Sequence, residues 1–178
     1  MLVQTVPFME DAGYSRKVGA GMILLTSVPS LLSKPVWGWL IDYASAQRLS
    51  LIGFTVNAVS MVVIVIAVRN HADVAVAAGF FMLGLGWGGL IPLQEVVWAS
   101  YFGRRYLGAV RSAGLPFSLI IGASSPFLTS FYFDRVGNYD GAFFTVAALG
   151  VVAIVLVGLA KQPVGRAEAQ PSEVAVAG

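Results

Sequence analysis

The sequence contains no cysteine and a single histidine, His71. It therefore has no disulfide framework and no thiolate metal site, and one imidazole cannot form a zinc site by itself. Charged residues are also scarce, at 11% of 178 residues against about 25% in an ordinary soluble domain. With so few charges the chain cannot cover a globular domain with a polar surface. The net charge of +2 is too small and too dispersed to indicate nucleic-acid binding.

Long apolar segments take up most of the chain, which is 57% hydrophobic with a mean hydropathy of +0.80. A helix of about 20 predominantly apolar residues crosses a bilayer. Segments of that kind cover approximately residues 18–40, 49–68, 74–102, 112–133 and 141–160. The sequence predicts an all-α polytopic membrane protein, in which residues 18–160 form a membrane domain of five complete transmembrane helices.

The two ends of the chain differ from these segments. Residues 1–17 are a short apolar stretch and a polar turn, without the charge order or cleavage site of a signal peptide. We expect them to be the end of a truncated sixth helix followed by an external turn. Residues 161–178 contain two prolines among scattered Ala, Glu and Gln, which predicts a disordered cytoplasmic tail.

Lysine and arginine are unevenly distributed between alternate links, and they favour the cytoplasmic side. Seven of the eleven lie in or beside the links at residues 42–48 and 103–111 and in the C-terminal tail. The other four are Arg16, Lys17, Arg69 and Arg135. We therefore expect a multi-pass protein of the cell membrane, such as a bacterial inner membrane, with a cytoplasmic C-terminus.

Two proline-containing segments form a weak internal repeat. Residues 26–33 read TSVPSLLS and residues 123–130 read ASSPFLTS, which agree at four of eight positions. The segments are three helices apart and so run in opposite directions, as an inverted repeat requires. Proline-interrupted helices at corresponding positions of two halves point to a transporter binding site. We expect Pro29 and Pro35 to interrupt the first helix, and Ser30 and Pro126 to contribute to substrate binding.

The segment 74–102 combines glycines with one carboxylate. Its small residues allow two helices to approach closely, at Gly84, Gly86, Gly88 and Gly89. Glu95, beside Gln94, is the only carboxylate deep in an apolar segment. Glu95 and Gln94 are candidates for proton coupling, and Glu95 is also a candidate for a pair with Lys34. The alternative is a packing residue paired with a base outside this chain.

Three stretches carry a resemblance to a known family. The first is Lys34-Pro35-x-x-Gly38-Trp39-x-x-Asp42 followed by Arg48, which resembles the link between the eighth and ninth helices of the major facilitator superfamily. The second is Tyr101-Phe102-Gly103-Arg104-Arg105 with Gly108, which is similar to the loop after the tenth helix in the branch of oxalate/formate antiporters and monocarboxylate transporters. The third is Asp134-Arg135-x-Gly137-x-Tyr139-x-x-x-Phe143, which is similar to the last external turn of that branch.

The resemblance implies a secondary transporter of two six-helix halves that works by alternating access. This chain would supply helices eight to twelve and the end of the seventh, as a C-terminal fragment whose partner is the first half. The implied substrate is a small organic anion and the implied coupling ion is a proton. No cofactor, metal ion or enzymatic activity is implied. A non-transporting membrane assembly or regulatory partner is the alternative.

Lys34 is the first candidate for the substrate site. In the resembling branch this position carries a base that meets the substrate carboxylate. The branch can place a second base in the eleventh helix, but residues 113–133 contain none, which argues against a dicarboxylate such as oxalate and favours a monoanion or a different substrate. The alternative is that Lys34 lies near the inner end of its helix and extends to the headgroups.

The inner links are candidates for conformational change. The expected residues are Gly38, Asp42, Arg48, Gly103, Arg104 and Arg105, through contacts between charges and helix dipoles. For Asp42 and Arg48 the alternative is a solvated turn. Arg104, Arg105 and Arg111 also determine topology, and Trp37 and Trp39 are expected to anchor the helix at the interface or to line the path.

Overall fold

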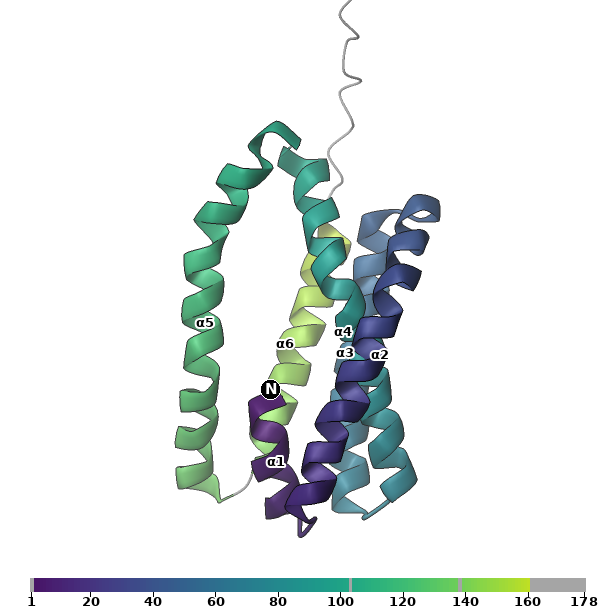
Figure 1. Ribbon diagram of the computed structural model, residues 1–178. Helices are drawn as coiled ribbons and strands as arrows, with labels where there is room; N and C mark the ends of the chain where they lie inside the picture. The colour runs from purple at the N-terminus through teal and green to yellow at the C-terminus, as the bar shows by residue number, and fades with distance from the viewer. Residues whose placement is uncertain (1, 103, 138, 161–178) are drawn as a thin grey trace, which may run out of the picture.

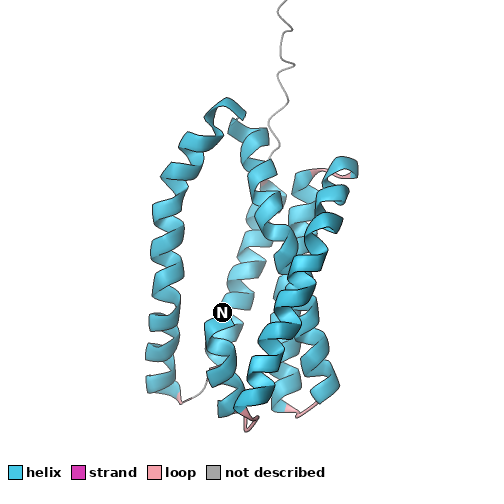
Figure 2. Cartoon of the chain, viewed as in Figure 1, coloured by secondary structure: helices cyan, strands magenta, loops and turns pink. Residues whose placement is uncertain are grey.

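The chain folds as a bundle of α-helices with short connections (Figures 1 and 2). A computed structural model describes residues 2–102, 104–137 and 139–160. Within these ranges there is no strand, and the helices are α1 (Leu2–Asp11), α2 (Arg16–Tyr43), α3 (Ala46–Arg69), α4 (Asp73–Phe102), α5 (Leu107–Val136) and α6 (Asp140–Leu159), with a 3-10 turn at Arg104–Tyr106. The predicted all-α fold is confirmed. Gly103 and the predicted tail at residues 161–178 lie outside the described residues.

Four of the described helices are long and apolar enough to cross a membrane, namely α3, α5, α6 and residues 73–99 of α4. Helix α2 has 28 residues and is therefore long enough, but its serines, prolines and charged residues lower its hydropathy. Successive helices run in opposite directions (Figure 1). The link at residues 44–45 and the turn at 104–106 therefore lie at one end of the bundle, called the basic end for Arg48, Arg105 and Arg111. Residues 12–15 and 70–72 lie at the opposite end.

Two helices extend beyond the approximate segments that the sequence indicates. Helix α2 continues without interruption through Pro29, Pro35 and Gly38 to Tyr43, so that only residues 44 and 45 separate it from α3. The connection is short because Ser45 caps α3, with its side-chain oxygen accepting from the backbone N–H of Arg48 at 3.4 Å. Helix α5 begins at Leu107, so Arg111 lies in a helix and not in a link.

The glycines of α4 bring it close to α2, as the sequence predicts. A Cβ atom at Gly84 would overlap the backbone carbonyl of Thr26, and one at Gly88 would overlap the Ser33 hydroxyl. Since only glycine leaves room for this approach, the two backbones pack directly against each other. We call this contact the α2–α4 seam. The opposite face of α4 packs against α3, where Gly86 meets Asn57.

The larger hydrophobic core lies toward the opposite end of the bundle, among α1, α3, α4 and α6. Phe8 and Phe143 stack there with ring centroids 4.2 Å apart, and Ile64 and Phe80 are almost fully buried. The cluster toward the basic end is smaller and consists of Trp37, Leu49 and Leu93.

Helix α5 stands apart from this packed group (Figure 1). None of its 30 residues is buried. It contacts α4 near Gly114, beside the Trp98 ring, and it ends at Gly137, whose φ of 76° permits the turn into α6. In the described part of the chain, α1, α2, α3, α4 and α6 therefore form a packed group, and α5 lies outside it.

Candidate substrate site

A polar stripe runs along α2 beside the seam. Ser27, Ser30 and Lys34 are spaced at i, i+3 and i+7, which places them on one face of a helix. Lys34 and Ser27 are exposed, and Ser30 is partly exposed. Among the described residues Lys34 has no ion-pair partner. The structure thus brings Lys34 and Ser30 together, and it adds Ser27, which the spacing could have revealed in the sequence.

The stripe borders an exposed apolar surface of α2. Leu24, Val28 and Leu31 are at least half exposed and lie on the side of the helix away from the seam. These apolar side chains suit contact with acyl chains, whereas serine hydroxyls and an ammonium group suit a water-accessible path. The helix therefore presents a packed face, an apolar face and a polar face.

Pro126 lies on α5 and not on the polar stripe. Its backbone carbonyl accepts a hydrogen bond of 3.3 Å from the Gln4 side-chain amide of α1. The sequence repeat pairs Pro126 with Pro29, which is buried in the α2–α4 seam. The two prolines thus have different surroundings, and the role of Pro126 in substrate binding stays a prediction.

Glu95 pairs with Arg111 across α4 and α5. The distance between Glu95 Oε1 and Arg111 Nη1 is 3.3 Å, and the two side chains are 33% and 58% exposed. Among the described residues Glu95 therefore pairs with Arg111 and not with Lys34, and a pair with a base outside the chain stays a prediction. Seven residues, or about 10 Å of helix rise, separate it from Gly88 at the seam. Gln94, the neighbouring candidate, is exposed.

Two of the conformational-link residues, Asp42 and Arg48, lie at the basic end and share no partner among the described residues. Asp42 is in the last turn of α2 and Arg48 in the first turn of α3; both are exposed, and neither has an ion-pair partner among the described residues. The negative Asp42 lies at the C-terminal end of α2, where the helix dipole is also negative. The positive Arg48 lies at the N-terminal end of α3, where the dipole is also positive, so the dipole disfavours both charges. A favourable contact for either charge must therefore come from another element, and the latch role stays a prediction.

The other link residues add little to a site. A Cβ at Gly38 would meet no atom within 4 Å, so packing does not require glycine there. The Arg105 guanidinium lies 5.9 Å from the centroid of the Tyr106 ring, a cation–π contact. Arg104 belongs to the 3-10 turn, but its side chain lies outside the described part of the chain.

Polar contacts at the opposite end were not predicted from the sequence. Arg69 of α3 binds Asp140 of α6 with an Nη2–Oδ2 distance of 2.5 Å, while Asp140 Oδ1 is buried without a partner among the described groups. The Tyr14 hydroxyl donates to Asp73 at 3.1 Å. The sequence shows charges at each turn, but it does not show which of them meet.

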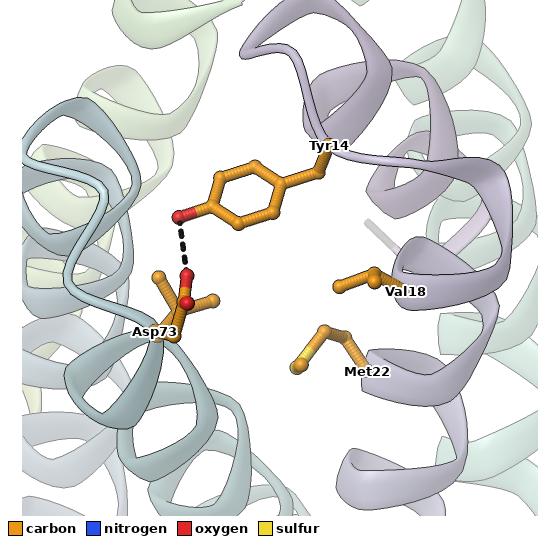
Figure 3. A pocket seen from close by; sticks show the side chains of 5 residues that line it. Tyr14, Val18, Met22 and Asp73 are labelled. Carbon is orange, nitrogen blue, oxygen red and sulfur yellow. Dashed lines mark hydrogen bonds between the residues drawn. The ribbon is translucent and has the colours of Figure 1, made fainter.

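Tyr14 and Asp73 border a cavity of about 260 Å³ (Figure 3). Val18, Met22 and Val76 form the rest of its lining, so it lies between the beginnings of α2 and α4. Burial, with the hydrogen bond to Asp73 and the charge of Asp73, raises the pKa of the Tyr14 phenol. The phenol therefore stays protonated and keeps donating at neutral pH. This cavity is distant from Lys34 along α2.

These features define a polytopic membrane protein with a polar face on one helix and an ion pair between two others. A family model of the Major Facilitator Superfamily matches residues 1–176. The chain therefore belongs to this superfamily of membrane transporters. No match is found among curated proteins or among solved structures.

Proposed function

We propose that this chain takes part in the transport of a small organic anion of the monocarboxylate type. It would act as the C-terminal half of a secondary transporter, with a further six-helix half on the other side of the path. Transport by alternating access would then expose the polar stripe of α2 to each side of the membrane in turn. The observation that carries this proposal is Lys34, an exposed cation in the middle part of α2 that has no ion-pair partner among the described residues.

The physical argument rests on the cost of that cation. A lysine at the centre of a bilayer costs about 2.5–3.5 kcal/mol on insertion scales. Such a residue is retained when it faces a path or a partner. Ser27 and Ser30 on the same face offer hydroxyl donors, and the described part of α5 offers no second base near its centre. One cation with neutral donors suits a ligand with a single carboxylate.

The test of the substrate site is uptake by the full-length transporter with Lys34→Ala and Lys34→Arg. Alanine removes the charge and should abolish uptake of labelled monocarboxylates at unchanged surface expression. Arginine keeps the charge but replaces a compact ammonium group with a planar guanidinium group, so uptake should fall partially. Normal uptake by Lys34→Ala would refute the proposed site.

Proton coupling is assigned to Glu95, with Arg111 as its partner when α5 is close to α4. Glu95→Gln keeps the shape of the side chain but cannot ionise. We expect it to remove uptake driven by a pH gradient and to leave exchange of substrate for substrate largely intact, because exchange need not return an empty carrier. An equal loss of both activities would show that the pair is structural.

We further propose that the basic end faces the cytoplasm, as the excess of lysine and arginine indicates. The chain lacks cysteine, so a thiol reagent labels only the single cysteine that is introduced into it. A cysteine at Tyr106 should resist an impermeant thiol reagent in intact cells, and one at Asn70 should react. The reverse pattern would overturn this orientation.

A further inference from the structure

The two neighbouring tryptophans of α2 have different environments. Trp37 is 8% exposed, and its indole N–H donates to the backbone carbonyl of Leu85 in α4 at 2.8 Å. Trp39 is 59% exposed and lies against Tyr43 of its own helix, with ring centroids 4.8 Å apart. The sequence expectation that both anchor the helix at the interface or line the path therefore does not fit Trp37, which is part of the seam.

Gly89 provides the space in which the Trp37 ring lies. A Cβ atom at position 89 would overlap three atoms of the indole. The ring thus rests directly on the α4 backbone, one residue after Gly88, where α4 meets Ser33. Trp37 and Gly89 form a matched pair, because a larger residue at 89 would displace the ring and with it the indole hydrogen bond.

Two side chains of α2 converge on one carbonyl group of α4. The Ser33 hydroxyl lies 3.3 Å from the same Leu85 oxygen that accepts from Trp37. Ser33 and Trp37 are one helical turn apart, so together they fix the position of α2 along α4 and its rotation about its own axis. A rotation of α2 about its axis would break both contacts at once.

Lys34 follows Ser33 directly and precedes Trp37 by three residues. At 3.6 residues per turn it projects about a quarter turn away from the Ser33 direction. The rotation that Trp37 and Ser33 hold therefore decides whether the polar face, with Lys34, points to a water-accessible path or toward acyl chains. Among the described residues no ion pair holds the ammonium group directly.

We propose that Trp37, seated on Gly89 and bonded to Leu85, is a positioning residue that directs Lys34 toward the anion. This inference rests on the proposed function for its consequence in transport. The orientation itself is a property of this chain and can be measured without transport. Trp37 acts through Lys34 and does not contact the substrate in this account.

The test uses Lys34→Cys in the otherwise cysteine-free chain, embedded in membranes. The labelling rate with a charged, water-soluble methanethiosulfonate reagent reports how far position 34 faces water. Trp37→Phe removes the N–H donor and keeps an aromatic ring, and Gly89→Ala displaces the ring. We expect each change to lower the labelling rate severalfold, with the larger effect for Gly89→Ala.

Two control variants leave the contact untouched. Gly21→Ala adds a methyl group to α2 where no atom lies within 4 Å, and Trp39→Phe changes the exposed tryptophan. Both should label at the rate of the parent Lys34→Cys chain. Circular dichroism and size exclusion establish that each variant is folded. If folded Trp37→Phe and Gly89→Ala variants label at the parent rate, Trp37 does not position Lys34.

Transport kinetics then separate this inference from the proposed function. In the full-length transporter with Lys34 present, Trp37→Phe should raise the KM for a labelled monocarboxylate severalfold and leave kcat nearly unchanged. A purely structural defect would reduce the amount of protein without altering KM. If labelling is slower but KM is unchanged, the result supports the role of Trp37 in positioning residue 34. The same result would refute the proposal that Lys34 binds the anion.

Discussion

Helices α2 and α5 are both neighbours of α4, and they are attached to it in opposite ways. Helix α2 lies along α4 through glycines and shares partly buried hydrogen bonds with it, at Ser33 and Trp37. Helix α5 has no buried residue and meets α4 through a half-exposed ion pair and the region of Gly114. Close backbone packing resists displacement, whereas an exposed ion pair contributes little. The comparison indicates that α2 moves together with α4 and that α5 is the element free to move.

The largest effect should come from filling the α2–α4 seam. In Gly88→Leu the new side chain would occupy the position of the Ser33 hydroxyl and the Ser30 carbonyl. Overpacking of a core commonly costs about 1–3 kcal/mol, and a clash with backbone should exceed that range. We expect loss of most folded protein, measured by size exclusion in detergent. The matched control is Gly108→Leu in α5, where no atom lies within 4 Å of the added Cβ.

A smaller effect should follow from breaking the ion pair that joins α3 to α6. Asp140→Ala leaves Arg69 unpaired, with the two side chains 46% and 23% exposed in the native pair. Partial exposure limits the cost to about 1 kcal/mol. The denaturation midpoint should fall accordingly. Because Asp140 Oδ1 has no partner among the described groups, Asp140→Asn should cost less than Asp140→Ala. An equal cost for the two variants would argue against this account of the pair.

The Glu95–Arg111 ion pair between α4 and α5 should contribute little to stability and more to restraining the motion of α5 relative to α4. Glu95→Gln and Arg111→Gln each weaken a half-exposed pair worth at most about 1 kcal/mol. Hydrogen exchange of the backbone amides at the beginning of α5 should become faster, while exchange in α2 stays the same. If exchange in α2 rises as much as in α5, the contrast between the two helices is wrong.

The smallest effect concerns the hydrogen bond from Tyr14 to Asp73. Tyr14→Phe removes an exposed bond and should cost about 0.5 kcal/mol. The folded-state pKa of the Tyr14 phenol lies above its unfolded value of about 10. The stabilisation of the folded state by this hydrogen bond is therefore complete below about pH 10, and it disappears as the pH rises through the raised pKa of Tyr14. The difference between the parent and Tyr14→Phe should thus be constant near neutral pH and vanish only in strong alkali.

Much of the fold could be predicted because hydropathy is a local property. The apolar segments, the all-α class and the close approach at Gly84 and Gly88 follow from residue types and their spacing. The uninterrupted course of α2 through Pro29 and Pro35 could not be predicted, since a helix in a membrane tolerates proline where its neighbours support it. The early start of α5 is not evident from the sequence, because Arg111 follows Arg104 and Arg105 closely and resembles part of one basic link.

The candidate site was predicted less completely than the fold. Lys34 and Ser30 share a face because their spacing is helical, but pairs between helices depend on how the elements dock. Nothing in the sequence indicates that Glu95 meets Arg111 or that Arg69 meets Asp140. The difference between Trp37 and Trp39 also depends on tertiary contact, because Gly89 accommodates one ring and not the other.

The most direct test of the account measures distances between spin labels in the full-length transporter, with and without a monocarboxylate such as acetate or lactate. Exposed positions suit the labels: Leu24 on α2, Phe81 on α4 and Leu119 on α5. We expect a narrow distribution of distances between labels at 24 and 81, which the anion does not alter. Between labels at 24 and 119 we expect a broader distribution that shifts when the anion binds. A shift between 24 and 81 as large as that between 24 and 119 would contradict the account.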